Sequence, residues 1–532
     1  MSPRYHAALP RLAWPIVLLI VTAVAAYPAM MIEPPAVDSP GFKWMGRRIL
    51  QGDVMYRDIW DHKLPVIHLI NALAAMLGDQ QTVLFLMESA GIAATGWLIS
   101  LLVRRHMGSW LIGVLTALTY VTFASTRHTI ERGNFTEQWG APFVVLCLYA
   151  ALRAARGGGW FWPIVSGFGL GMAICLRPPS ILIGGVLLLL VPSLWRAGRF
   201  TVATVLGWFV GFAIVPAAVC VWAASQGVLG LMLSLCLGFN FSYATQQPSL
   251  PAWTGAWRTV LSLVVSTWLW HLIGAMGLAE VVFKWVEQQN REPGRRGGIP
   301  IKGIAVVWLL TAVASALLTR WLWIHYYYLV LAPVAFLSAW AWQSLARFCQ
   351  RLEAWRSAFL FWLVSAAIFA GMGYQVVMDY GGASQCRRDA ACIGEAVAFL
   401  AEHGKPTDTL YIFPWGIEIE ISARLGWRCP SRHAYVGHYP PLPGSLAPGG
   451  LMEQWRDDML RSPPDWLVCS AYDDLMAGLV RDLDGWGVLT RAKEIGGEVS
   501  DAYQGFYVER ARFSSGGPKD YPYNTVIIYQ RK

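Results

Sequence analysis

Charged residues are scarce in this chain of 532 residues: Asp, Glu, Lys and Arg together make up 14% of it. Hydrophobic residues make up 55%, and the mean hydropathy is +0.43. This balance excludes an ordinary soluble globular protein. The apolar residues form repeated runs of about 17–25 residues, the length that a helix needs to cross a bilayer. We therefore predict a polytopic α-helical membrane protein.

Several motifs of soluble enzymes are also missing. The chain has no nucleotide-type Gly-rich loop and no H-E-x-x-H zinc motif. It has no C-x-x-C pair, which argues against metal binding by the four cysteines near its C-terminus. The basic residues are scattered over short loops and do not gather on one face, so we expect no nucleic-acid partner.

The apolar runs predict eleven spans. We place them near residues 12–31, 82–103, 110–125, 137–152, 160–176, 180–195, 201–224, 258–283, 303–319, 326–346 and 358–378. The first run lacks a small-residue cleavage site, so we expect it to be retained as a span. Segment 64–77 is apolar but short, which predicts a surface or re-entrant helix.

The positions of the basic residues predict the orientation. If segment 64–77 does not cross, one set of short loops collects a series of arginines and lysines, and the positive-inside rule makes these loops cytoplasmic. These residues are Arg4, Arg11, Arg104, Arg105, Arg153, Arg156, Arg196, Arg199, Lys284, Arg291, Arg295, Arg296, Lys302, Arg347, Arg351 and Arg356. The opposite, external side then receives loops 38–65, 125–136 and 225–257 and everything after about residue 379. The net charge of +9 is thus mostly anchoring charge.

The composition changes at about residue 380, which divides the chain into a membrane domain, 1–380, and an external domain, 381–532. Apolar runs shorten there, and four segments read as strands: Thr409–Phe413, Trp466–Ser470, Gly505–Val508 and Thr525–Gln530. Amphipathic stretches such as Ile393–Glu402 and Asp474–Leu483 alternate with them. The pattern predicts a small α/β domain with its own core.

Four cysteines lie in this external domain, an even number that suggests disulfides in an oxidising space. Cys386 and Cys392 are close in sequence and would close a short loop. Cys429 and Cys469 are then the remaining pair.

The first external loop, DSPGFKWMGRRILQGDVMYRDIWDHKLP, concentrates the charge that the rest of the chain lacks. Its charged and titratable residues are Asp38, Lys43, Arg47, Arg48, Asp53, Arg57, Asp58, Asp61, His62 and Lys63. Cations in such a loop hold a phosphate at the membrane surface while a carboxylate acts on a hydroxyl. A solvated juxtamembrane loop is the alternative interpretation.

The same loop resembles the first external loop of the GT-C membrane glycosyltransferases. The match is closest to the bacterial branch related to protein O-mannosyltransferases and the lipid A aminoarabinose transferase. It is carried by Asp38, Gly52, Tyr56, Arg57, Asp58, Lys63 and Pro65, with K-L-P where the family usually has K-P-P. The resemblance implies a GT-C-like fold of about 11 spans with a C-terminal external domain. It also implies a bacterial inner membrane location, with the site on the periplasmic side.

Two further segments fit the resemblance. His325, Tyr326 and Pro333 resemble the H-Y-x-x-x-x-x-x-P segment that lines the donor cavity in the family, although an aromatic belt explains most aromatic residues around them. Glu137 corresponds to a second acidic residue, which with Asp38 would share a divalent cation (Mg, Mn or Ca) or divide base and orienting roles. A favourable helix dipole is the alternative for Glu137.

The mechanism implied is inverting transfer from a polyprenyl-phosphate sugar to a hydroxyl of a glycolipid, glycan or protein, beside membrane lipids. Asp38 would be the base. The leaving phosphate would be neutralised by Arg57, Lys63, Arg177 and Arg320, although snorkelling also explains Arg177. Substrate contacts would come from Tyr56, Asp58, His62, Glu137, His325 and Tyr326, and the amphipathic piece Val228–Tyr243 would gate the cavity.

Two other classes stay open. A transporter or flippase of lipid-linked glycans should carry its charges in mid-span, whereas here they concentrate in external loops. A non-catalytic envelope assembly protein should tolerate Asp38→Asn, which a transferase should not.

Overall fold

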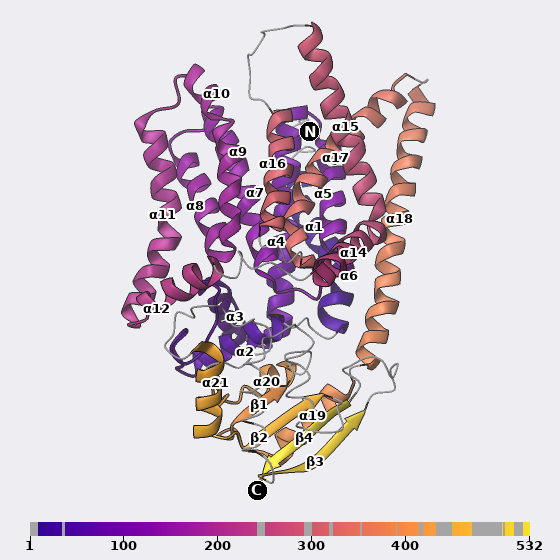
Figure 1. The fold of residues 1–532 in the computed structure, drawn as a ribbon. Coiled ribbons are helices and arrows are strands. Elements are labelled where there is room, and N and C mark those ends of the chain that lie inside the picture. Colours follow the sequence, from indigo (N-terminus) through magenta and orange to yellow (C-terminus); the bar gives the residue numbers. More distant parts are fainter. Residues whose placement is uncertain are drawn as a thin grey trace.

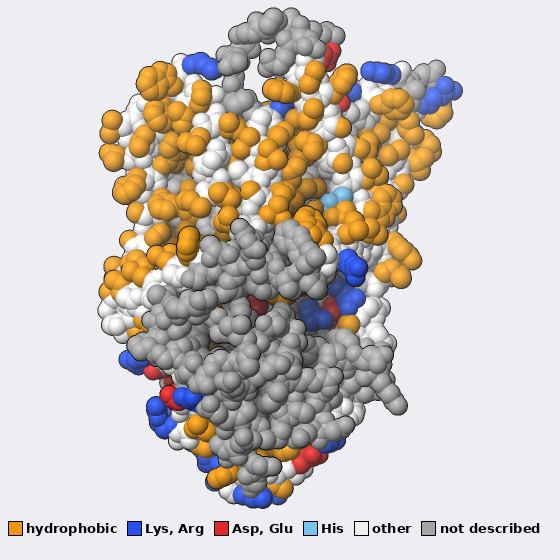
Figure 2. Space-filling model, in the orientation of Figure 1, with side chains coloured by type: hydrophobic (Ala, Val, Ile, Leu, Met, Phe, Trp, Pro, Cys, Tyr) orange, Lys and Arg blue, Asp and Glu red, His pale blue; other side chains and the backbone are white. Residues whose placement is uncertain are grey.

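The computed structural model describes residues 9–33, 38–241, 250–291, 301–318, 323–351, 354–389, 391–413, 419–431, 450–470, 499, 503, 506–514 and 525–532. A tall helical bundle stands on a small domain that contains a β-sheet (Figure 1). Hydrophobic side chains cover the visible sides of the bundle, and Lys and Arg side chains lie toward its ends (Figure 2). The predicted class, a polytopic helical membrane protein with a C-terminal α/β domain, is confirmed.

The bundle is formed by helices that correspond to the predicted spans. They are α1 (Leu9–Tyr27) with η1 (Pro28–Ile32), α4 (Gln80–Met107), α5 (Trp110–Ala124), α7 (Thr136–Ala155), α8 (Phe161–Leu176), η2 (Pro178–Ile183) with α9 (Gly184–Leu188) and α10 (Val191–Arg196), α11 (Val202–Ser225), α15 (Trp268–Arg291), α16 (Ile301–Leu317), η4 (Ile324–Tyr327) with α17 (Tyr328–Cys349), and α18 (Ala354–Asp389). Within the described ranges, eight helical segments are long and apolar enough to cross a membrane, and α5, α8 and α16 are shorter apolar helices.

One predicted span has the wrong bounds. The run at 258–283 is not one helix, because α14 (Leu250–Ser266) ends before Thr267 and α15 begins at Trp268. The crossing helix is therefore α15, which starts ten residues later than the apolar run. Apolar composition alone does not reveal such a break, since both sides of it are hydrophobic.

The predicted sorting of the loops is reproduced. Arg156 donates to the carbonyl of Arg105 (2.9 Å), and Arg199 donates to the carbonyl of Ala155 (2.8 Å). Three basic loops thus meet at one end of the bundle, and the C-terminal domain lies at the other end (Figure 1).

Short helices cover the bundle end that faces the C-terminal domain. They are α2 (Asp38–Leu50), α3 (Val66–Leu77), α6 (Arg127–Ile130), α12 (Leu229–Leu233) and η3 (Ser234–Phe239). Helix α3 packs on α2 below the bundle, as expected for segment 64–77 (Figure 1). The described part of the predicted gating piece packs on the first loop, with the Phe239 and Trp60 ring centroids 5.3 Å apart.

The C-terminal domain combines a four-stranded sheet with three described helices. These elements are α19 (Ala391–His403), β1 (Leu410–Phe413), α20 (Ile419–Leu425), α21 (Gly450–Arg461), β2 (Trp466–Ser470), β3 (Tyr507–Ser514) and β4 (Thr525–Arg531). The strand order is β1-β2-β4-β3, with β1 and β2 parallel and the other pairs antiparallel. Val468 lies between Ile412 and Ile528 in the sheet, and all three are buried. Strands are confirmed at the four predicted places, but β3 begins at Tyr507 and continues to Ser514, six residues beyond the predicted Gly505–Val508. The predicted helix Asp474–Leu483 lies outside the described residues.

The predicted disulfide between Cys386 and Cys392 is not formed. Cys386 lies near the end of α18, where its Sγ accepts a hydrogen bond from Arg127 (2.9 Å). Cys392 is packed instead in the core of the C-terminal domain. The two side chains therefore face different parts of the molecule. No disulfide joins Cys429 and Cys469 either.

Helix α18 connects the bundle to this domain. It has 36 residues, which at 1.5 Å per residue gives a length of about 54 Å, well beyond the hydrocarbon core of a bilayer. Near its lower end Asp379 accepts a hydrogen bond from the backbone N–H of Arg127 (2.8 Å). Arg127 also pairs with the buried Glu33 at 2.8 Å, so α18, α6 and the end of the first span are tied together.

Candidate active site

The charged loop brings its two ends together. Asp38 is the first residue of α2, and its carboxylate lies 3.7 Å from the amine of Lys63. The two side chains are 30% and 22% exposed. The Lys63 amine also lies over the ring of Phe42, 4.9 Å from its centroid. A carboxylate and an ammonium group thus lie side by side, partly open to solvent.

Buried residues of the loop hold Lys63 in place. Tyr56 is completely buried with φ +69, a left-handed conformation that non-glycine residues rarely adopt. Its hydroxyl donates to the carbonyl of Lys63 (2.9 Å), and burial raises its pKa well above the ordinary value. The structure therefore places Tyr56 as a support for Lys63, with its hydroxyl bonded to protein.

Asp61 fixes the turn before Lys63. It is fully buried, and its Oδ1 accepts the backbone N–H of His62 (2.6 Å), while its Oδ2 lies 3.0 Å from Nε2 of His68. Burial opposes the charge of Asp61, but Lys63, His62 and His68 outweigh it and hold its pKa well below the ordinary value. The pKa of His62 is lowered, chiefly by burial. The sequence did not assign this anchoring role to Asp61, because an aspartate in a charged loop gives no sign of its burial.

A second ion pair lies close by, between Glu137 at the start of α7 and Arg177 at the end of α8. It is nearly inaccessible, with the side chains 1% and 6% exposed. The Arg177 guanidinium lies over the ring of Tyr326 at 3.9 Å and donates to the carbonyl of Ser315 (3.4 Å). Three residues singled out from the sequence, Glu137, Arg177 and Tyr326, are thus brought together from three parts of the chain.

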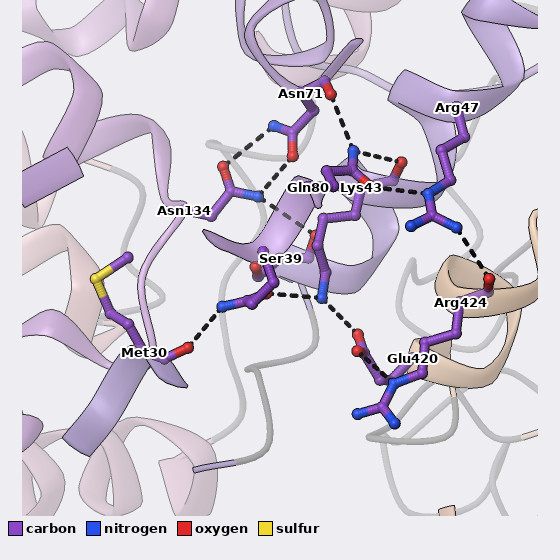
Figure 3. Close-up of polar contacts among 10 residues, drawn as sticks. Met30, Ser39, Lys43, Arg47, Asn71, Gln80, Asn134, Glu420 and Arg424 are labelled. Carbon is purple, nitrogen blue, oxygen red and sulfur yellow. Dashed lines mark hydrogen bonds and ion pairs between the residues drawn. The ribbon is translucent and has the colours of Figure 1, made fainter. Parts of the chain in front are cut away.

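The loop between α6 and α7 joins the two ion pairs. Asn134 donates to the carbonyl of Ser39, next to Asp38 (3.4 Å), and exchanges hydrogen bonds with Asn71 (Figure 3). The next residue, Phe135, stacks on the ring of His325 with centroids 4.3 Å apart. His325 Nδ1 also lies 3.2 Å from a carboxylate oxygen of Glu131. This loop therefore contacts α2 on one side and leads directly into Glu137 on the other.

The backbone of this loop is unusual. Glu131, Arg132, Gly133 and Asn134 all have positive φ, at 48°, 74°, 85° and 65°. The φ of +85° at Gly133 favours glycine, and an added Cβ would also require Cε of Met30, 2.6 Å away, to shift. Three non-glycine residues in this conformation store strain, which is often found at functional sites.

Arg57 and Asp58 lie elsewhere. Arg57 donates two hydrogen bonds to Asp58, at 2.8 and 3.0 Å. Both line an open cleft of about 680 Å³ between the first loop and α21, together with Gly52, Asp53, Arg428, Cys429, Pro430, Gln454, Asp457, Asp458 and Arg461. Lys63 and Arg177 are not among the lining residues. Arg320, the last predicted phosphate ligand, lies outside the described residues.

The predicted divalent cation between Asp38 and Glu137 stays a prediction. Asp38 faces Lys63 and Glu137 faces Arg177, so each carboxylate already has a cation of the protein as its partner. In the described part of the chain, no group of three or more His, Cys, Asp or Glu side chains is arranged to hold a metal ion.

No protein-family model and no curated protein sequence matches the chain. Solved structures do match: ArnT from Cupriavidus metallidurans in the apo state has a TM-score of 0.57 and 13% identity over 99% of this chain and 98% of its own. The same protein bound to undecaprenyl phosphate has a TM-score of 0.56 and 12% identity over 97% and 98%. This chain therefore has the GT-C fold of membrane glycosyltransferases, as its first loop predicts.

Proposed function

We propose that this protein is an inverting glycosyltransferase that moves a sugar from a polyprenyl-phosphate donor to an acceptor hydroxyl at the external face of the membrane. The observation that carries the proposal is the partly exposed pair of Asp38 and Lys63 at one end of a bundle with the GT-C fold. The complex of the structurally similar ArnT with undecaprenyl phosphate supports a polyprenyl-phosphate donor.

The chemistry needs one base and one phosphate-neutralising cation. Asp38 accepts the proton of the acceptor hydroxyl while the acceptor oxygen attacks the anomeric carbon. The bond from that carbon to the phosphate oxygen breaks, and its electron pair leaves with the polyprenyl phosphate. The attack comes from the face opposite the phosphate, so the anomeric configuration inverts.

Lys63 is the cation best placed to stabilise the developing negative charge. Its separation from Asp38, 3.7 Å, is longer than a hydrogen bond, and its four-carbon stem is flexible. The amine can therefore move from Asp38 to the phosphate when donor binds, which also releases the carboxylate for proton transfer.

Arg177 has a more restricted role in this proposal. Its guanidinium is held by Glu137, Ser315 and the ring of Tyr326. It reaches a phosphate only if Glu137 releases it, so we assign it first to positioning Tyr326 and Glu137. His325 and Tyr326 then border the donor site. Arg57 lies in the separate cleft and is the weakest of the predicted phosphate ligands.

The test is complementation of a deletion strain, with its glycolipids and glycans compared with those of the parent by mass spectrometry. We expect one glycosylated species to disappear, to return with the wild-type gene and to stay absent with Asp38→Asn. An unchanged glycan profile in the deletion strain would remove the proposed function. Full restoration by Asp38→Asn would remove Asp38 from the role of base.

The external location of the site is tested separately with topology reporters. A reporter fused after residue 380 should be active only outside the cytoplasm, and one placed within residues 285–300 only inside. The opposite result would exclude a polyprenyl-linked donor at the Asp38 site.

A further inference from the structure

We propose that the C-terminal domain is a working part of the catalytic unit: the buried ion pair of Lys43 and Glu420 sets the position of α2 and, through it, of Asp38. The role of Asp38 as base is that of the proposed function, on which this inference rests. Lys43 and Glu420 are positioning residues in this account, and neither touches substrate.

The ion pair joins two domains at a fully enclosed point. The Lys43 amine lies 2.7 Å from a carboxylate oxygen of Glu420 in α20, and the two side chains are 5% and 7% exposed. The same amine donates to the side chain of Gln81 in α4 (3.0 Å). An ammonium of α2 is therefore bonded at once to the C-terminal domain and to the bundle. Removing the charge of Glu420 would leave the buried Lys43 without its carboxylate partner, and removing that of Lys43 would leave Glu420 with Arg424 alone.

Two neighbouring side chains of α2 also bind the C-terminal domain. Arg47 donates to the carbonyl of Arg424 (2.9 Å), and Trp44 donates its indole N–H to the carbonyl of Trp427 (3.0 Å). Positions 43, 44 and 47 lie on one side of a helix, since residues four apart are neighbours on its surface. One face of α2 is thus attached to α20 and the turn after it (Figure 3).

Helix α2 is also attached to the bundle, and Arg47 takes part in this contact too, because its Nε donates to the side chain of Gln80 (3.0 Å). Gln80 donates to the carbonyls of Lys43 (3.1 Å) and Asn71 (2.9 Å) (Figure 3). At Gly46 an added Cβ would lie 2.6 Å from the backbone nitrogen of Ala72, so α2 touches α3 backbone to backbone. Helix α2 is therefore held between the bundle and the C-terminal domain.

Asp38 is the first residue of this helix and lies five residues from Lys43, a distance of about 7.5 Å along the axis. The contact at Gly46 makes a natural pivot, because the two backbones meet there. Loss of the Lys43–Glu420 contact would let the Asp38 end tilt, and displacement of a catalytic group by about 1 Å is enough to slow a reaction strongly.

The experiment compares full-length variants purified in detergent and the same variants in membranes of the deletion strain. Lys43→Met and Glu420→Gln break the pair, and Lys43→Glu with Glu420→Lys exchanges it. Arg424→Gln is the matched control, because Arg424 pairs with the other oxygen of Glu420 from an exposed position on the same helix. Hydrogen exchange of residues 38–50 reports the position of α2, and the rate of glycan formation in the membranes reports transfer.

We expect both single variants to raise hydrogen exchange in α2 and to slow transfer by roughly tenfold or more, as misplacement of a base does. The control should change neither readout, and the exchanged pair should recover both. The exchanged pair also covers the case in which a single variant fails to fold.

Three outcomes would overturn the inference. The first is unchanged transfer in a folded Lys43→Met protein. The second is slow transfer with α2 protected as in the wild type. The third is an exchanged pair that is folded and protected but inactive. Failure of the proposed function looks different: the deletion strain would then keep the glycan profile of its parent, while the exchange data on α2 still followed the ion pair.

Discussion

Two ion pairs lie at the same end of the bundle, and they differ in the separation of their charged groups and in their exposure to solvent. Asp38 and Lys63 are 3.7 Å apart and partly exposed, whereas Glu137 and Arg177 are in direct contact and almost completely buried. An exposed, loose pair is separated at little cost because water replaces the lost partner. A buried pair is not, because each charge would be left without solvent. The comparison fits the proposed roles, in which the first pair takes part in the reaction and the second stabilises the fold.

The largest expected effect is on stability. Arg177→Ala leaves Glu137 buried and uncompensated, so the free energy of unfolding should fall by about 3–5 kcal/mol. The double variant Arg177→Met with Glu137→Gln should recover most of this loss, because no isolated charge remains. Thermal melting in detergent measures both. A fully stable Arg177→Ala protein would mean that Glu137 does not depend on Arg177, and the contrast between the pairs would fail.

Asp38→Asn should have the opposite profile. Asparagine keeps the size and most of the helix-capping ability of aspartate, so melting should stay close to the wild type. An amide does not accept the acceptor's proton, so transfer should fall by roughly 10²-fold or more. If transfer persists in the purified variant, Asp38 is not the base.

Lys63→Ala should weaken binding of undecaprenyl phosphate by about 1.5–3 kcal/mol, the value of a charge-assisted hydrogen bond. Its stability should change by less than about 1 kcal/mol, since its ion pair is partly exposed. Arg57→Ala is the matched comparison, because Arg57 bonds to Asp58 in the separate cleft. An equal loss of binding in Arg57→Ala would return Arg57 to the phosphate site, where the sequence placed it.

The smallest effect is expected from pH, and it reports on buried carboxylates. Burial opposes the charges of Asp61 and Glu420, but their partners outweigh it and lower both pKa values from the ordinary 3.8 and 4.5. Since the folded pKa values are depressed, this stabilisation is complete above the unfolded values and is lost as the pH falls through the folded ones. Melting temperatures should therefore drop below about pH 4.

Melting of the Glu420→Gln variant distinguishes the contribution of Glu420 to this pH dependence from that of Asp61. The groups that face Glu420 are Lys43, Arg424 and, near the same contact, Arg47. Loss of its charge should flatten the acid side of the melting profile, because one depressed pKa has been removed. An unchanged acid slope would assign the pH dependence to Asp61 and other carboxylates.

The sequence predicted what depends on local composition. Apolar runs located the spans, and the short length of 64–77 correctly excluded it from them. The spacing of Asp38 and Lys63 in the first loop, read through a family resemblance, pointed to two residues that the fold brings into contact. Glu137, Arg177 and Tyr326 were singled out in the same way, and their proximity followed.

Contacts between distant parts of the chain, and the burial of single side chains, could not be predicted from the sequence. Lys43 and Glu420 are separated by 377 residues, and no sequence pattern around either residue predicts that the two are in contact. Asp61 is fully buried beside His68, a contact that the order of residues along the chain does not reveal. The predictions of one span at 258–283 and of a disulfide between Cys386 and Cys392 were also wrong. Neither apolar composition nor spacing along the chain determines where a helix ends or where two side chains point.

The continuity of helix α18 limits which insertions and deletions this protein tolerates in evolution. It runs without a described break from the far end of the bundle to the edge of the C-terminal domain. One residue inserted into its lower part would turn everything beyond it by about 100° and advance it by about 1.5 Å. Glu420 would then face away from Lys43. A surface loop of this protein can gain a single residue without such a rotation. An insertion or deletion in this helix must instead add or remove close to whole turns, so that Glu420 faces Lys43 again.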